Sequence, residues 1–108
     1  MFRIFITEEF DRDFEKLDES DKKRVRSIRE QLKEQGDSVG KPLTLNHFRE
    51  KKFGNRRLYF LVYKEFKTIL IVGISNKKTQ QSTINKILLE LNQYQEFIIN
   101  ELIKVNRD

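Results

Sequence analysis

Apolar stretches with strand character are concentrated between residues 47 and 75. Residues 57–63 are rich in aromatic and β-branched side chains, and residues 68–72 are almost purely apolar, which is typical of a strand buried on both faces. Gly54-Asn55 predicts a two-residue hairpin turn, because glycine tolerates the positive φ that such a turn needs. The charged run at residues 64–67 is a second break. The pattern therefore predicts a three-stranded antiparallel meander.

Two amphipathic helices are predicted ahead of this meander, after a short apolar run of strand type at residues 2–6. Thr7 is suited to cap the first helix and Ser20 to cap the second, while Gly36 is placed to end the second helix in a left-handed conformation. The apolar stripes of these helices consist of Phe10, Phe14 and Leu17 and of Val25, Ile28 and Leu32. The short connection between the helices predicts an antiparallel helical hairpin.

A long helical pattern occupies residues 80–105. One continuous helix of this length would measure roughly 39 Å, which exceeds the roughly 27 Å diameter expected of so small a domain. The helix is therefore expected either to break near Asn92-Gln93 or to overhang the domain. Residues 37–42 are loop by composition. The predicted order is β-α-α-β-β-β-α, an α+β fold in a single domain spanning residues 1–108.

Net positive charge is confined to the predicted sheet. Residues 41–57 contain six basic side chains and one acidic one, a net charge of +5, whereas residues 1–40 and 79–108 each carry a small excess of acids. A concentrated basic patch indicates a phosphate-bearing partner. The alternative is that Lys and Arg only keep the edge of a hairpin soluble.

Several classes of protein are excluded by composition. The chain has no Cys, which excludes disulfides, a thiolate nucleophile and a thiolate metal site. One His, and no His, Asp and Glu cluster at ligand spacing, argue against zinc, so no metal or other cofactor is expected. No apolar run approaches the roughly 20 residues of a membrane span, and the apolar run at residues 2–6 is too short for a signal peptide. We therefore expect a cytoplasmic protein.

Four short motifs resemble the RelE/ParE toxin superfamily, and the resemblance extends over nearly the whole chain. They are Gly40-Lys41-Pro42-Leu43, Phe48-Arg49-Glu50-Lys51, Gly54 with Arg57 in Arg-Leu-Tyr-Phe, and an Ile/Val-rich strand that ends in Lys77-Lys78. The resemblance implies a small toxin of a toxin–antitoxin system that pairs with a cognate antitoxin. RelE-like members cleave messenger RNA at the ribosome, and ParE-like members instead inhibit DNA gyrase. A member without catalytic activity, which only binds RNA or antitoxin, is a third reading.

The candidate catalytic residues follow from the chemistry of metal-free RNA cleavage. The ribose 2′-hydroxyl attacks the adjacent phosphate, and the protein must orient the two, stabilise negative charge and move protons. By position in the family, the basic residues for these roles are Arg49, Lys51, Arg57 and Lys78. Arg49 and Lys51 are two residues apart on one strand and so share a sheet face. We expect all four side chains to converge on one concave basic surface, with His47 as a candidate general base.

A second group of basic residues is predicted to bind RNA without reading its sequence: Lys41, Lys52, Arg56 and Lys77. The family's Tyr position falls at Ile84 or at another residue of Gln80-Gln81-Ser82-Thr83. No Tyr lies there, which leaves the general acid unassigned.

The tail of the chain carries more apolar residues than one buried face requires. Phe97, Ile99 and Ile103 lie off the main stripe of the last helix. We expect this second face, within residues 94–105, to contact a partner. The candidates are a second copy of the chain, forming a homodimer through this helix, or a segment of the antitoxin.

Overall fold

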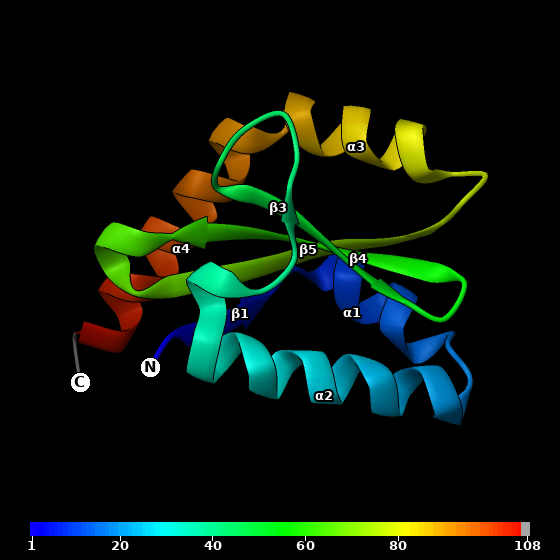
Figure 1. Cartoon of the computed structure of the whole chain (residues 1–108). Coiled ribbons are helices and arrows are strands. Elements are labelled where there is room, and N and C mark those ends of the chain that lie inside the picture. Colours follow the sequence, from blue (N-terminus) through cyan, green and yellow to red (C-terminus); the bar gives the residue numbers. More distant parts are fainter. Residues whose placement is uncertain (107–108) are drawn as a thin grey trace.

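A five-stranded mixed sheet forms the centre of the molecule in the computed structural model, which describes residues 1–106 (Figure 1). The strands are β1 (Arg3–Ile6), β2 (Lys41–Pro42), β3 (Phe48–Phe53), β4 (Arg56–Tyr63) and β5 (Thr68–Asn76). They are ordered β1-β5-β4-β3-β2, with β1 parallel to β5 and every other pair antiparallel. The predicted meander is therefore β3-β4-β5, with β4 in the middle of the sheet.

Helices cover both faces of this sheet, as Figure 1 shows. Helices α1 (Glu8–Glu15) and α2 (Glu19–Gln35) pack on one face and α3 (Gln80–Leu89) and α4 (Leu91–Asn106) on the other. The first apolar core includes Phe10, Val25, Ile28, Leu32, Leu58, Phe60 and Ile71. The second includes Phe48, Tyr59, Leu61, Leu70, Ile84, Ile87 and Ile98. Successive residues of a strand point to opposite faces of the sheet. Along β3 and β4, side chains therefore face the first core and the second core in turn.

Both predicted breaks in the meander are confirmed. Gly54 has φ +54° in the turn that joins β3 to β4, and Lys67 has φ +49° after the short 3₁₀ turn at Lys64–Phe66. Residues 58–62 of β4 and 68–73 of β5 are buried, as expected of central strands.

The helix boundaries near the N-terminus differ in part from the predictions. Thr7 caps α1, since its Oγ1 accepts a hydrogen bond from the Phe10 amide at 3.1 Å. The cap of α2 is Asp18 and not Ser20, because the Asp18 carboxylate accepts from the Asp21 amide at 2.7 Å and starts the helix earlier.

Gly36 ends α2 in a right-handed conformation, with φ −41°, so the left-handed cap is wrong. The reason for glycine here is space: a Cβ would lie 2.6 Å from Ile69 Cδ1 and 2.8 Å from Phe2 Cδ1. The residue after α2 that does adopt a left-handed conformation is Gly40, with φ +80°. It precedes β2, a two-residue strand paired to Glu50 and Arg49 where the composition predicted only loop.

The C-terminal helical pattern is interrupted at Glu90, two residues before the first of the residues where a break was expected. Two helices of ordinary length can each lie against the sheet, whereas one straight helix of that length could not. Phe97 is partly buried and packs against the second core, so it is less available to a partner than the second apolar face predicted from the sequence. Ile99 and Ile103 are 39% and 51% exposed.

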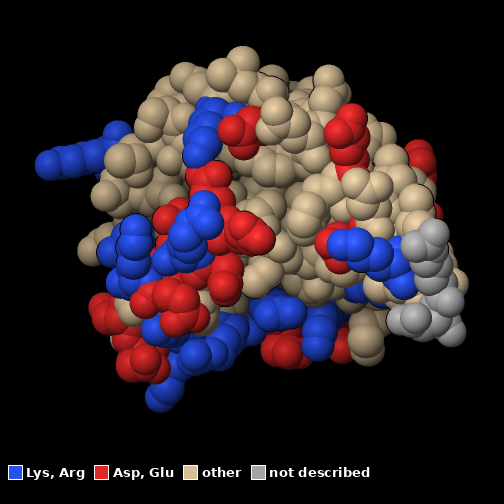
Figure 2. All heavy atoms as spheres, turned by 180° about the vertical axis from the view of Figure 1, so that it is seen from behind, with Lys and Arg blue, Asp and Glu red and all other residues tan. Residues whose placement is uncertain are grey.

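The outer surface of the helices carries mixed charge. Seen from behind, acidic and basic side chains alternate over the lower part of the molecule, where α1 and α2 lie (Figure 2). This agrees with the nearly neutral balance of the helical segments in the sequence. Within residues 1–106, no helix is both long and apolar enough to cross a membrane.

Candidate functional site

Strand register divides the candidate basic residues between the two faces of the sheet. Arg49 pairs with Phe60 and Lys51 with Leu58, and both partners belong to the core under α1 and α2. Arg56 pairs with Phe53, which lies in the same core. Directly paired residues project to one side of a sheet. Arg49, Lys51 and Arg56 therefore face α1 and α2.

Arg57 lies on the opposite face. It pairs with Lys52, and next to this pair Glu50 is opposite Tyr59, which belongs to the core under α3 and α4. Lys41 of β2 pairs with Glu50 and so joins this side. The prediction that Arg49, Lys51, Arg57 and Lys78 converge on one surface is wrong. A hairpin register shifted by one residue moves every side chain to the other face, and the sequence leaves that register open.

A carboxylate and a guanidinium meet on the α3 side of the sheet. Glu50 Oε2 lies 4.0 Å from Arg57 Nε, and both side chains are 12% exposed. Gln80, at the start of α3, donates from Nε2 to the same Glu50 oxygen at 2.9 Å. We call Glu50, Lys52, Arg57 and Gln80 the Glu50–Arg57 cluster. It brings together a proton acceptor and cations suited to phosphate.

Tyr59 lies next to this cluster, directly opposite Glu50 on the neighbouring strand. It is fully buried, and its hydroxyl shares a hydrogen bond of 2.9 Å with Ser75 Oγ. Burial raises the pKa of Tyr59 to about 12, partly opposed by the Ser75 hydrogen bond. Since a fully buried ring cannot touch a substrate, Tyr59 is a positioning residue that remains a neutral phenol at pH 7.

The sequence contained a signal for Glu50. It is the only acid among residues 41–57, and it alternates with Lys52 on one strand. Gln80 is one of the residues at which the family's tyrosine position could fall, but only the packing of α3 on the sheet brings it to Glu50.

On the face of the sheet that α1 and α2 cover, Arg49 and Arg56 contact polar groups of that same face. Arg49 Nη1 donates to the Asp37 carbonyl at 2.8 Å. Arg56 Nε lies 3.3 Å from Asp21 Oδ2, and the same carboxylate pairs with Arg24 at 2.7 Å. Arg56, predicted to contact RNA, is therefore paired within the fold to a carboxylate that it shares with Arg24.

Lys77 and Lys78 lie in the exposed turn between β5 and α3. Reciprocal bonds between Asn76 and Thr79 brace this turn: Thr79 donates its amide to Asn76 Oδ1 at 2.9 Å and accepts from the Asn76 amide at 3.1 Å. The turn follows Ser75, which pairs with Arg57, so both lysines lie at the end of the sheet that carries the Glu50–Arg57 cluster.

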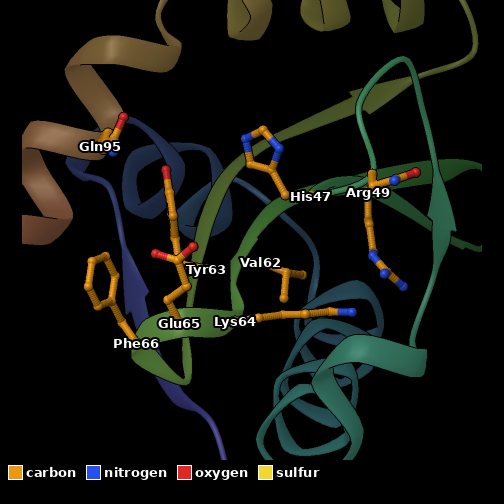
Figure 3. Close-up of a pocket in the computed structure, with 9 residues that line it drawn as sticks. His47, Arg49, Val62, Tyr63, Lys64, Glu65, Phe66 and Gln95 are labelled. Atoms are coloured by element: carbon orange, nitrogen blue, oxygen red, sulfur yellow. The ribbon is translucent and has the colours of Figure 1, made fainter.

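His47 lies at the other end of β4. Its carbonyl accepts from the Val62 amide at 2.8 Å, and its ring centroid is 6.1 Å from that of Tyr63. Tyr63 is six residues from Arg57 along the strand, roughly 20 Å. The expectation that His47 shares a catalytic site with Arg57 is therefore wrong. His47 instead lines a separate cavity of about 470 Å³, shown in Figure 3.

Ile84, one of the residues at which the family's tyrosine position could fall, is buried in the second core and offers no proton donor. In the part of the chain from residue 1 to 106, no three His, Asp or Glu side chains gather where they could share a metal ion.

No protein-family model matches this chain, and no curated protein matches it in sequence. Solved structures do. The isolated E. coli RelE toxin is 12% identical with a TM-score of 0.64, over 81% of this chain and 99% of that one. An E. coli RelE mutant in complex with a peptide of the antitoxin RelB is 11% identical with a TM-score of 0.63, over 76% and 93%.

The toxin–antitoxin complex RelBE2 from Mycobacterium tuberculosis contains a third similar chain. It is 22% identical with a TM-score of 0.55, over 70% of this chain and 98% of that one. The five-stranded mixed sheet, the paired helices on each face and the long C-terminal helix together give this chain the RelE toxin fold.

Proposed function

We propose that this chain is a RelE-like toxin of a type II toxin–antitoxin system and that it cleaves messenger RNA without a metal ion. The RelE fold supports the first part of the proposal. The observation that supports cleavage is the position of the Glu50 carboxylate, 4.0 Å from the Arg57 guanidinium on a basic face of the sheet.

In this proposal Arg57 binds the scissile phosphate, since a guanidinium makes two parallel hydrogen bonds to phosphate oxygens. Glu50 takes the proton of the 2′-hydroxyl as that oxygen attacks the phosphorus. An incoming phosphate competes with Glu50 for Arg57, so substrate binding loosens the pair and frees the carboxylate. Gln80 then holds Glu50 in place through its 2.9 Å hydrogen bond.

The remaining cations on this side extend the phosphate surface. We assign Lys52 and Lys41 to the RNA backbone on the Arg57 face, and Lys77 to the same role from the turn. Lys78, in the same turn, is the candidate to neutralise charge on the leaving 5′-oxygen. Arg49 and Lys51 receive no catalytic role, because they project to the other face of β3.

A cognate antitoxin is the proposed protein partner, and the ribosome with its message the proposed target, which implies a cytoplasmic protein. Two of the similar structures are toxin–antitoxin complexes. On this chain the exposed Ile99 and Ile103 of α4 line a groove together with Phe66, and the groove offers an apolar surface to an amphipathic segment.

Expression of the chain alone, with primer extension on cellular messages, tests this function. We expect new 5′ ends within coding regions, and none with an Arg57→Ala variant that folds normally. Loss of DNA supercoiling with intact messages would instead indicate a ParE-like gyrase inhibitor. Toxicity with neither effect would indicate a family member without catalytic activity, which only binds RNA or antitoxin.

A further inference from the structure

The cavity of about 470 Å³ at the far end of β4 has no part in the cleavage chemistry proposed above. It forms where β3 begins at Phe48 and the chain before it turns away from β4. The 3₁₀ turn at Lys64–Phe66 and helix α4 enclose it further, as Figure 3 shows. Its volume is in the range of small-molecule sites in proteins.

One side of the cavity is aromatic. The rings of His47 and Tyr63 are tilted by 53° with centroids 6.1 Å apart, and Phe66 is 43% exposed beside them. The Gln95 side chain on α4 also lines the cavity, near Tyr63 in Figure 3. Aromatic rings that line a cavity next to an amide are groups with which proteins stack and read unpaired bases.

The other side of the cavity is cationic. Arg49 Nε is buried, and among the described residues it has no hydrogen-bond partner, since only Nη1 reaches the Asp37 carbonyl. Lys64 lines the same cavity and makes no ion pair within residues 1–106. Two cationic side chains on one side of a cavity favour an anionic group there. Glu65 is the one acid in the lining, and its carboxylate suits the amino group of a base.

We propose that this cavity binds one nucleotide unit, with the base against Tyr63 and His47, its edge at Gln95, and its phosphate at Lys64 and Arg49. The assignment of single-stranded RNA as the source of that nucleotide rests on the proposed function. Since the cavity and the Glu50–Arg57 cluster are roughly 20 Å apart along β4, one RNA chain can occupy both. The cavity then selects which nucleotide lies on the RNA strand at that distance from the cleaved bond.

Nuclear magnetic resonance of the isotope-labelled chain tests the proposal. The probes are the four nucleoside 5′-monophosphates and a short single-stranded RNA, the latter added to the Arg57→Ala variant so that it is not cut. We expect the resonances of His47, Tyr63 and Gln95 to shift in a saturable manner. Gln95→Glu, which places a negative charge in the cavity, should weaken binding roughly tenfold or more.

Gln93→Glu is the matched control, because Gln93 is exposed on the same helix and lies outside the cavity. It should bind as the unmodified chain does, and thermal unfolding should show that both variants fold. Equal binding by the two variants, or no shifts at millimolar nucleotide, would overturn the proposal. Monophosphate binding without RNA binding would confirm a nucleotide cavity and reject RNA as its source. Intact cellular messages would refute the cleavage function and leave the monophosphate result valid.

Discussion

Glu50 Oε2 and Arg57 Nε lie 4.0 Å apart on the side of the sheet covered by α3. Their strands are adjacent and antiparallel, and the partner of Arg57 is Lys52, two residues from Glu50, so the two side chains meet diagonally on one face. A pair with so little exposure holds its geometry without a substrate. In the function proposed above, this pair takes a proton beside a bound phosphate.

Replacement of Glu50 by Gln should abolish most cleavage while the protein stays folded. The amide keeps the shape of the side chain but is not a base, and loss of a general base typically costs 10²–10⁴-fold in rate. Primer extension with quantified messages measures the effect, and Glu34→Gln is the control, because Glu34 is exposed on α2 and lies outside both the cluster and the cavity. Full cleavage by Glu50→Gln would reject Glu50 as the base.

Lys51 and Lys52 are neighbours in sequence on opposite faces of β3, which makes them a matched pair. Lys52→Ala should reduce RNA cleavage by roughly 10- to 150-fold, since a hydrogen bond to a charged group contributes about 1.5–3 kcal/mol. Lys51→Ala should have little effect, because its side chain faces α1 and α2. The same assay compares both variants, and a larger loss with Lys51→Ala would contradict the assignment of the site to the α3 face.

Burial raises the pKa of both Tyr59 and Tyr63 from an ordinary value of 10.0 to about 12. The folded state therefore holds these phenol protons more tightly than the unfolded chain does. Their contribution to the free energy of unfolding is complete below pH 10 and is lost as pH rises through 12. Urea unfolding at a series of alkaline pH values should show this decline. The Tyr59→Phe/Tyr63→Phe variant should show a weaker decline, and an unchanged one would disprove the cause.

Gly36→Ala should destabilise the fold by about 1–3 kcal/mol, the usual cost of overpacking. Its Cβ would lie 2.6 Å from Ile69 Cδ1. Gly73→Ala is the control, since the nearest atom to a Cβ there is Ile87 Cδ1 at 3.6 Å, an ordinary contact. Chemical denaturation of both variants measures the difference, and comparable stabilities would show that α2 shifts to make room.

The exposed pair Ile99 and Ile103 should belong to a partner surface. Ile99→Glu with Ile103→Glu is expected to abolish self-association or antitoxin binding without unfolding the chain, because both positions are already in solvent. Sedimentation of the chain, alone and with antitoxin, measures this, with Asn100→Glu as the control on the same helix. Unchanged assembly in the double variant would mean that α4 has no partner there.

Local chemistry alone was enough to determine much of this fold. The run of apolar side chains from Thr68 to Val72 forms a buried strand wherever a sheet exists, and Gly54 and the break at Lys64–Lys67 place the turns on either side of β4. Thr7 caps α1 by accepting a hydrogen bond from the amide of Phe10, three residues further along the chain. These are interactions between residues close in sequence, so the pattern of residue types is sufficient to predict them.

The site depended on tertiary structure. The sequence indicated a basic sheet and named Arg57, but whether Arg49 or Glu50 shares its face is decided by the register of β3 on β4. Gln80 reaches Glu50 across 30 residues, and Ile84 is buried because α3 packs on the sheet. A shift of one residue along a strand reverses which side chains meet. Only the packing of both cores against the two helical layers selects one register.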